Sequence, residues 1–343
     1  MAGFALYREP GQKHVMLIRQ RQGTPQTAAS HTFLTDRQGF VFAPFAISEA
    51  TPLLLIEGDP EEAPSASDLH EVADEMARTQ AEDHGPQPSR SDYAADFEVF
   101  HRALADAAYE KLVLARSLCI DRTTDLPPCE LFFRACRMYP QQFVALISTP
   151  ATGTWLMATP ETLLSREDDC WRTMALAGTM PGNVKAPWSD KNVREQRYVS
   201  AYIRAILERM AVNIEESRPH TVTAGSVVHL QTDFRFTLPT ATTLGSLLDT
   251  LHPTPAVCGL PKEQALRFIL RHEHTDRRYY AGFAGPLGIG RTTHLYVSLR
   301  CMELFAHSFR LYAGGGLISD SIEQQEWEET EAKLMTMQSL LKV

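Results

Sequence analysis

Short apolar runs separated by turn residues recur along most of the chain and predict strands. Two of them, HVMLIRQ at 14–20 and TPLLLIEG at 51–58, lie in the first part of the sequence. Two later groups of runs are separated by glycine, proline or acidic turn residues, which is typical of antiparallel meanders. They are QQFVALIST (141–149), TWLMATP (154–160), ETLLSRE (161–167), CWRTMALAG (170–178), YYAGFAGPLG (279–288), THLYVSLRCMEL (293–304) and SFRLYAGGGL (308–317).

Apolar positions with helical spacing predict a small number of helices. Phe97, Phe100, Leu104 and Ala108 recur every three to four residues, so we expect a helix over 92–110 that is capped by Ser91. Similar patterns predict helices at 128–138, at 190–218 with Asp190 as its cap, and at about 321–341. The connection at 57–91 is acidic and rich in proline and alanine, and we expect one short amphipathic helix inside it.

This order of elements predicts a fold class. Lys111 opens another strand-like run, KLVLARSLCI, between two of the predicted helices. Long stretches of strands with few helices between them indicate an α+β fold with large antiparallel sheets, and not a doubly wound parallel sheet. The glycine-rich AGGG at 313–316 lacks the lysine of a nucleotide-binding loop, so a phosphate loop is excluded.

Composition narrows the class of protein. The formal charge of −9 argues against a nucleic-acid-binding protein, which usually carries a basic face. No run of 18 apolar residues predicts a membrane span, and the first residues do not resemble a signal peptide. The six cysteines show no metal-binding spacing, so we expect reduced, buried thiols. These features together favour a cytoplasmic enzyme.

Acidic residues near the C-terminus form a candidate metal site. Glu326 and Glu329 are three residues apart on one helical face, with Lys333 four residues further on and Glu323 extending the row. A solvated helix face with one ion pair explains this spacing too, and would contribute only a few tenths of a kcal/mol. The alternative is a site for a hard divalent cation, which prefers oxygen ligands. Glu195, in the predicted helix at 190–218, is the best second source of a ligand.

Eight blocks of sequence, in order, resemble a known family. They are KLVLARS, ATPETLL, ALAGT, LHPTPAVCGLP, YYAGFAG, YVSLRCMEL, LYAGGGL and EWEETEAKL. Through these blocks, residues 92–343 resemble the chorismate-utilising enzymes, and most of all the isochorismate synthases among them. The resemblance implies a single chorismate-binding domain over 1–343, with short N-terminal strands at 1–56 and a catalytic core at 92–343. It also implies that two large antiparallel sheets, flanked by helices, enclose the site.

The resemblance further implies the chemistry and its principal residues. Water would add at C2 of chorismate while the C4 hydroxyl leaves, with Mg²⁺ as the cofactor. Lys111 stands where the family keeps its general base, which acts only in the neutral form. Glu161 stands where the family keeps its general acid, which must be protonated at the working pH. Glu195 and Glu329 match magnesium ligands of the family, and Glu326 matches a supporting ligand that acts through water.

Other positions match substrate contacts of the family. Arg300 and Tyr280 match residues that hold the enolpyruvyl carboxylate, for which an arginine offers a bidentate fork. The remaining matches are Gly178, Thr179, Ala256, Gly314 and Lys333, although tight turns and core packing explain the glycines and the alanine as well. His252 lies in a matching block, and a structural role suits it at least as well as a functional one.

Two departures from the family and several alternatives stay open at this point. Asn192 stands where many members have a further acid, and MPG (180–182) replaces basic residues that several relatives carry. The reaction product would feed menaquinone or a catechol siderophore, and salicylate synthase is the nearest rival. Ammonia-using relatives fit less well with a lysine base at 111. A degenerate chorismate binder and a purely structural Ca²⁺ site are alternatives of another kind, and the protein would be a monomer or a homodimer.

Overall fold

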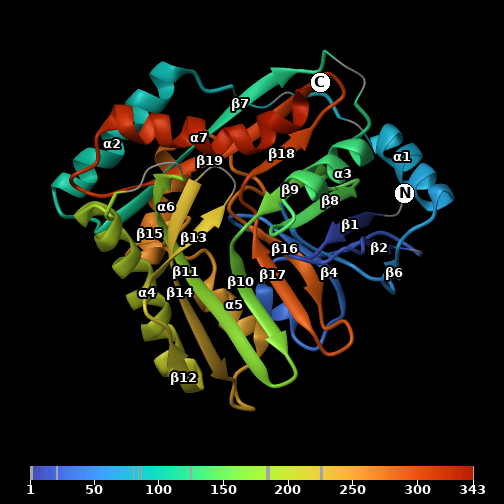
Figure 1. Cartoon of the computed structure of the whole chain (residues 1–343), viewed down its shortest axis with the longest axis horizontal. Coiled ribbons are helices and arrows are strands. Elements are labelled where there is room, and N and C mark those ends of the chain that lie inside the picture. Colours follow the sequence, from blue (N-terminus) through green and yellow to red (C-terminus); the bar gives the residue numbers. More distant parts are fainter. Residues whose placement is uncertain are drawn as a thin grey trace.

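Two large antiparallel sheets form the body of the protein (Figure 1). The computed structural model describes residues 3–342 except 21, 80, 84, 86, 124–125, 183–185 and 225–226. Within this range the fold is α+β, as predicted, and no helix is long and apolar enough to cross a bilayer. The helices are α1 (Ala66–Thr79), α2 (Arg90–Ala105), α3 (Pro128–Met138), α4 (Asp190–Met210), α5 (Leu244–Leu251), α6 (Lys262–His272) and α7 (Glu323–Leu341), with a 3-10 turn at His31–Leu34.

The first sheet, called sheet A here, joins strands from both ends of the chain. Its order is β15 (Gly259–Leu260), β7 (Lys111–Asp121), β19 (Ser308–Leu317), β18 (Cys301–Leu304), β9 (Gly153–Thr159), β8 (Phe143–Thr149), β1 (Phe4–Arg8), β2 (Met16–Arg19) and β6 (Glu61–Glu62). Strand β19 pairs with β7 from Ser308 opposite Asp121 to Leu317 opposite Leu112. This register places the glycines of β19 beside the start of β7, where Lys111 lies.

The second sheet, called sheet B, contains the second half of the first predicted meander and the first half of the second. Its order is β12 (Val212–Glu216), β14 (Val227–Thr237), β11 (Cys170–Pro181), β10 (Thr162–Glu167), β17 (Thr293–Val297), β16 (Phe283–Leu287), β4 (Gly39–Ala43), β5 (Leu53–Ile56) and β3 (Gln26–Ala28), and β13 (His220–Ala224) also pairs with β14. Because β1 and β2 belong to sheet A whereas β3, β4 and β5 belong to sheet B, the first 56 residues contribute to both sheets.

Apolar side chains fill two clusters that hold these layers together. The larger cluster lies between the sheets and joins residues such as Phe143 and Trp155 of sheet A to Phe40 and Phe42 of sheet B. The smaller cluster covers the other face of sheet A, where α1, α3 and α7 pack. Helix α4 packs on β11 and β14 of sheet B. This packing fixes the positions of the two sheets and of α7, which surround a cavity.

The predicted element boundaries are correct in part. Helix α3 spans the predicted residues, but α2 begins two residues early, and Ser89 caps it in place of Ser91. Likewise Ser189 caps α4 in place of Asp190. Helix α4 ends at Met210 rather than 218, because the following residues pair with β14 as strand β12.

The run at 293–304 is two strands and not one. Strand β17 belongs to sheet B and β18 to sheet A, so the chain crosses between the sheets over residues 298–300. Arg300 has a φ of 47° at this crossing, which is a left-handed conformation that a side chain other than glycine rarely adopts. Alternation of apolar residues alone gave no sign of this crossing. All six cysteines are free, but only Cys258 and Cys301 are fully buried.

Candidate active site

A narrow cavity between the sheets gathers most of the predicted site residues. Its walls come from β7, β11, β14, β19, α4, α7 and the loops around Ala256 and Tyr280. Nine predicted residues line it: Glu161, Gly178, Thr179, Glu195, Ala256, Tyr280, Arg300, Gly314 and Lys333. Lys111 contacts Glu195 of this wall, whereas Glu326 and Glu329 reach the same region from α7. Elements far apart in sequence therefore meet at one place.

The Lys111 side chain is fully buried beside Glu195. Its Nζ lies 2.9 Å from Glu195 Oε1, as an ion pair that lacks hydrogen-bond geometry. A Cβ atom on Gly316 would lie 2.0 Å from that Glu195 oxygen and 2.9 Å from Lys111 Cε. Only a glycine at this position of β19 lets the two side chains meet. The pair links the predicted base to a predicted metal ligand.

Glu161 is the strongest candidate for a proton donor. The residue follows β9 and is only 3% exposed, and its backbone carbonyl accepts a hydrogen bond from Val297. Burial raises the pKa of Glu161 to about 8, although the charges of Lys111, Arg300 and Lys333 oppose the rise. The carboxyl group therefore carries a proton at neutral pH, as a general acid requires.

His229 is a residue of this cavity that the sequence did not reveal. Its Nδ1 lies 2.9 Å from the Gly178 carbonyl oxygen, and its Nε2 lies 3.1 Å from Arg300 Nη2. Since a carbonyl only accepts, Nδ1 carries the hydrogen and Nε2 accepts from the guanidinium. Burial and the Arg300 charge lower the pKa of His229 to about 3, so the ring is neutral. The sequence signal that could have identified His229 is its inward-facing position on strand β14, but that strand was not predicted from the sequence.

Lys333 and Tyr280 meet the glycine run of β19. Lys333 Nζ donates to the Gly314 carbonyl oxygen at 2.8 Å and to Glu329 Oε1 at 2.6 Å. A Cβ on Gly314 would lie 2.8 Å from the Tyr280 hydroxyl, and the Tyr280 ring stacks on Tyr312. These contacts fix an ammonium group and a phenol on the cavity wall, close to Arg300.

The remaining substrate candidates are backbone positions and one residue outside the cavity. Gly178 has a φ of 68°, and Asn192, the position that departs from the family pattern, donates from Nδ2 to the Thr179 carbonyl oxygen at 3.4 Å. Ala256 lies on the cavity wall. His252 is not part of this wall, because its Nε2 lies 3.1 Å from the Pro44 carbonyl oxygen in the core. That position favours the structural interpretation of His252.

Each of the three predicted metal ligands is paired with a lysine. Glu195 meets Lys111 and Glu329 meets Lys333, as described, and Glu326 forms an ion pair with Lys191 of α4. Burial and the Glu329 charge raise the pKa of Glu326, while Lys191 opposes the rise. Burial acts against ionisation of Glu329 too, but Lys333 and Lys191 hold the pKa of Glu329 below its ordinary value.

These three glutamates offer oxygen ligands that suit a hard divalent cation, even though each of them is paired with a lysine. Among the described residues, no three His, Cys, Asp or Glu side chains are arranged closely enough to form a ready-made metal site. However, Glu326 Oε2 is buried and has no well-formed hydrogen bond, and a Cβ on Gly315 would lie 3.1 Å from it. Carboxylate oxygens beside an open stretch of glycine backbone fit the preference of Mg²⁺ for oxygen ligands.

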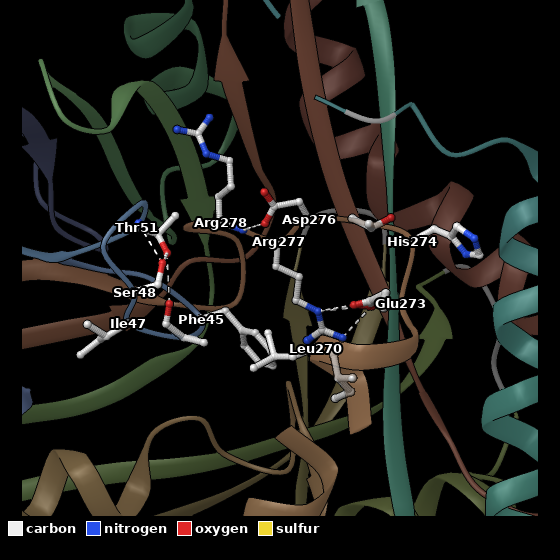
Figure 2. A pocket seen from close by; sticks show the side chains of 13 residues that line it. Phe45, Ile47, Ser48, Thr51, Leu270, Glu273, His274, Asp276, Arg277 and Arg278 are labelled. Atoms are coloured by element: carbon white, nitrogen blue, oxygen red, sulfur yellow. Dashed lines mark hydrogen bonds and ion pairs between the residues drawn. The ribbon is translucent and has the colours of Figure 1, made fainter. Parts of the chain in front are cut away.

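A second cavity is lined by residues from 45–51 and 269–278 (Figure 2). Figure 2 shows Arg277 pointing to Glu273, with the Phe45 ring close to its guanidinium at 4.2 Å. Arg277 also donates to the carbonyl oxygens of Val257 and Val113, each at 2.7 Å. Both valines line the first cavity, so this buried pair supports the wall of the candidate site from behind.

A buried glutamic acid, buried lysines and a buried arginine thus meet at one cavity enclosed by two antiparallel sheets, which is an arrangement that suits a small anionic molecule. A family profile described as "Chorismate binding enzyme" matches residues 61–342. The chain belongs to this family of chorismate-binding enzymes.

Curated relatives and a solved structure agree with this assignment. "Isochorismate synthase MenF" of Escherichia coli is 30% identical over 266 residues, which cover 75% of this chain and 61% of that protein. "Isochorismate synthase DhbC" of Bacillus subtilis is 31% identical over 271 residues, which cover 74% and 68%. The chain thus spans about three fifths of the length of MenF. The solved structure of the menaquinone-specific MenF of Escherichia coli shares the fold, with a TM-score of 0.80, 23% identity and coverage of 99% and 89%.

Proposed function

We propose that this chain is an isochorismate synthase, which converts chorismate to isochorismate. The observation that carries the proposal is the buried, protonated Glu161 in one cavity with Glu195 and the adjoining Lys111. An acid and a base on opposite sides of a ring are what a displacement with an allylic shift requires. The names of the two relatives above support the same reaction.

The charges around the cavity suit a dicarboxylate. With Lys111 in the neutral form that a base requires, Lys191, Lys333 and Arg300 carry three formal positive charges, and Glu195, Glu326 and Glu329 carry three negative charges. A dianion alone would make the region negative, and a divalent cation alone would make it strongly positive. When the dianion and the divalent cation bind together, the net charge of the region stays unchanged. We therefore expect each of them to strengthen the binding of the other.

The proposed reaction follows from the positions of these side chains. Lys111, in its neutral form, takes a proton from the water that adds at C2, and Glu161 gives its proton to the C4 hydroxyl, which leaves as water. The two conjugated ring double bonds shift from C1=C2 and C5=C6 to C1=C6 and C4=C5, so atoms and charges balance. Arg300, held by His229, orients one carboxylate through its guanidinium. Tyr280 and Lys333 complete the wall that faces the ligand.

We further propose Mg²⁺ as the cofactor, held by Glu195, Glu329 and Glu326. A bound divalent cation would supply positive charge next to a substrate carboxylate. Glu329→Gln should therefore raise the Mg²⁺ concentration needed for half-maximal activity by about tenfold or more. An unchanged magnesium titration would remove Glu329 from the metal site. Relatives of the menaquinone and siderophore routes match this chain about equally, so the proposal concerns the reaction and not the pathway.

The deciding experiment is a product analysis. The purified protein is incubated with chorismate, with and without Mg²⁺, and the products are separated by HPLC. Isochorismate that forms only with Mg²⁺ is the expected result, and Lys111→Ala should reduce turnover by about 10²–10⁴-fold while chorismate still binds. Salicylate and pyruvate would instead assign the salicylate synthase reaction. No product, even with ammonia present, would support a chorismate binder without catalysis.

A further inference from the structure

Lys191 places a positive charge in the acidic cluster that the proposed cofactor would use. It is the second residue of α4, and its Nζ forms an ion pair with Glu326 Oε1 on α7. Glu326 is only 1% exposed, so its charge is poorly solvated and needs a partner. The charges of Glu195 and Glu329 also act on Lys191. One lysine therefore compensates part of the charge of three carboxylates.

The second oxygen of Glu326 faces the glycine backbone, and Ser321 also interacts with this carboxylate. Glu326 Oε2 is buried and accepts no well-formed hydrogen bond, and the nearest part of β19 is Gly315. Glu329 Oε1 lies on the same side of that glycine. One side of the Glu326 carboxylate is therefore bound to a lysine, while the other side is ready for a further positive group.

Among the three lysines of the site, Lys191 can leave most easily. Lys111 is fully buried between Glu195 and β19, and Lys333 is fixed by the Gly314 carbonyl oxygen as well as by Glu329. The Lys191 side chain is 23% exposed, and its Nζ donates a hydrogen bond to Glu326 Oε1. Rotation of this side chain at the first turn of α4 would carry its ammonium group into water without breaking a backbone contact.

We propose that Lys191 is an internal cation that neutralises the cluster of Glu326, Glu329 and Glu195 and is displaced when a divalent cation binds. Lys191 competes with the metal for Glu326 and thereby weakens metal binding in the absence of substrate. It also keeps the buried carboxylates of the metal-free protein compensated. This inference rests on the proposed metal site and adds to it the residue that sets the metal affinity.

Calorimetric titration of the substrate-free protein with Mg²⁺ tests the competition. Lys191→Met removes the competing charge, so Mg²⁺ should bind about tenfold more tightly than in the wild type. Lys191→Arg keeps the charge and should bind Mg²⁺ as weakly as the wild type. Arg194→Met is the matched control, because Arg194 lies on the same helix but pairs with the exposed Asp320. Its Mg²⁺ affinity should change less than about twofold.

Amine labelling of the wild type tests the displacement directly and needs no variant. A limited reaction with an N-hydroxysuccinimide ester, followed by mass spectrometry, measures the acylation of each lysine. Addition of Mg²⁺ should increase the labelling of Lys191, because its ammonium group moves into solvent, and should leave the exposed Lys13 unchanged.

The outcomes separate this inference from the proposed function. Wild-type binding of Mg²⁺ with weaker or equal binding by Lys191→Met would overturn the competition and leave the metal site intact. Unchanged or reduced labelling of Lys191 in the presence of Mg²⁺ would likewise overturn the displacement. Absence of Mg²⁺ binding in all the proteins, with and without chorismate, would overturn the metal assignment of the proposed function and this inference with it.

Discussion

Glu161 shows how burial alone can prepare a side chain for chemistry. Its environment contains three cations that favour ionisation, yet the loss of hydration outweighs them and the pKa rises to about 8. The folded protein therefore keeps a proton that the unfolded chain has already lost between pH 4.5 and about 8. By linkage, the stability of the fold must fall as the pH rises through this interval.

Glu161→Gln should remove that part of the pH dependence. A glutamine keeps the size and a hydrogen donor but does not ionise, so the variant should not lose stability by this route. Between pH 6 and 8, the wild type should lose up to about 1.4 kcal/mol per pH unit relative to the variant. Urea unfolding at several pH values measures the difference. Burial also raises the pKa of Glu303 to about 7. Glu303 contributes equally to the pH dependence of both proteins, so its effect cancels in the comparison.

Parallel pH dependences of the two proteins would show that Glu161 is ionised in the fold at neutral pH. The carboxyl group could then not serve as the acid, even if the protein were active.

Most single residues could be predicted from sequence because they belong to a recognised block, whereas Glu195 was predicted from its place near the start of a predicted helix. Lys111, Glu161 and Arg300 stand in such blocks, and the structure brings them to one cavity or next to it. Lys191 and His229 were missed, because their partners, Glu326 and Arg300, are 135 and 71 residues away in the chain. Only the fold defines such pairs.

At the level of elements, the glycine run of β19 determines how closely the side chains around it approach one another. Gly314, Gly315 and Gly316 each face a different group: the Tyr280 hydroxyl, the Glu326 carboxylate, and the Glu195–Lys111 pair. Glycines allow a ligand to approach the backbone closely. The structure shows that protein side chains also occupy this space.

Gly316→Ala should separate Lys111 from Glu195. The added Cβ would lie 2.0 Å from Glu195 Oε1, so one side chain must move, and activity should fall by about 10²-fold or more. Gly315→Ala is the control on the same strand, since its Cβ would approach only Glu326 and Glu329. It should mainly weaken Mg²⁺ binding. Turnover and Mg²⁺ titrations measure both effects. Equal losses of turnover and of Mg²⁺ affinity in both variants would contradict the different roles given to the two glycines.

The buried pair of Arg277 and Glu273 connects three elements behind the site (Figure 2). Arg277→Met should destabilise the fold by about 3–5 kcal/mol, because Glu273 would keep a buried, uncompensated charge. A second change, Glu273→Gln, should recover part of the loss. Denaturant unfolding measures these changes, and Arg204→Met, which removes two ion pairs at the surface, should cost less than about 1 kcal/mol. A small effect of Arg277→Met would mean that water reaches Glu273.

Element boundaries were predictable where local signals decide them. The proline at the start of α3 and the glycines of β19 mark their elements clearly. The end of α4 and the division of residues 293–304 depend instead on strand pairing, which no local pattern contains. Strand β14 likewise pairs with the distant β11, which lies before α4 in the chain, as well as with β12 and β13, which directly precede it.

At the scale of the whole molecule, the first 60 residues belong to both sheets. Strand β1 lies between β8 and β2 in sheet A, and β4 lies between β16 and β5 in sheet B. The family match begins only at residue 61, although these strands supply core residues such as Phe40 and Phe42. The α+β class and the two sheets were predicted from sequence, whereas the contribution of this segment to both sheets was not.

Removal of residues 1–60 should therefore prevent folding. The truncated chain would expose the edges of β8 and β16 and lose part of the core between the sheets, so we expect no cooperative thermal transition. Circular dichroism and dye binding measure this outcome. Coexpression of residues 1–60 as a separate peptide should restore the transition. A stable, cooperative truncated protein would contradict the role given to these strands.

The position of β19 has a consequence for protein synthesis. This strand joins β15 and β7 to the rest of sheet A, and it follows all the other strands in the chain. A nascent chain that has not yet emerged beyond residue 307 therefore holds two unconnected parts of that sheet, each with an unpaired edge. Such edges are prone to association with other chains. Ribosome-bound chains of this protein should consequently need chaperone protection until translation of the glycine strand is complete.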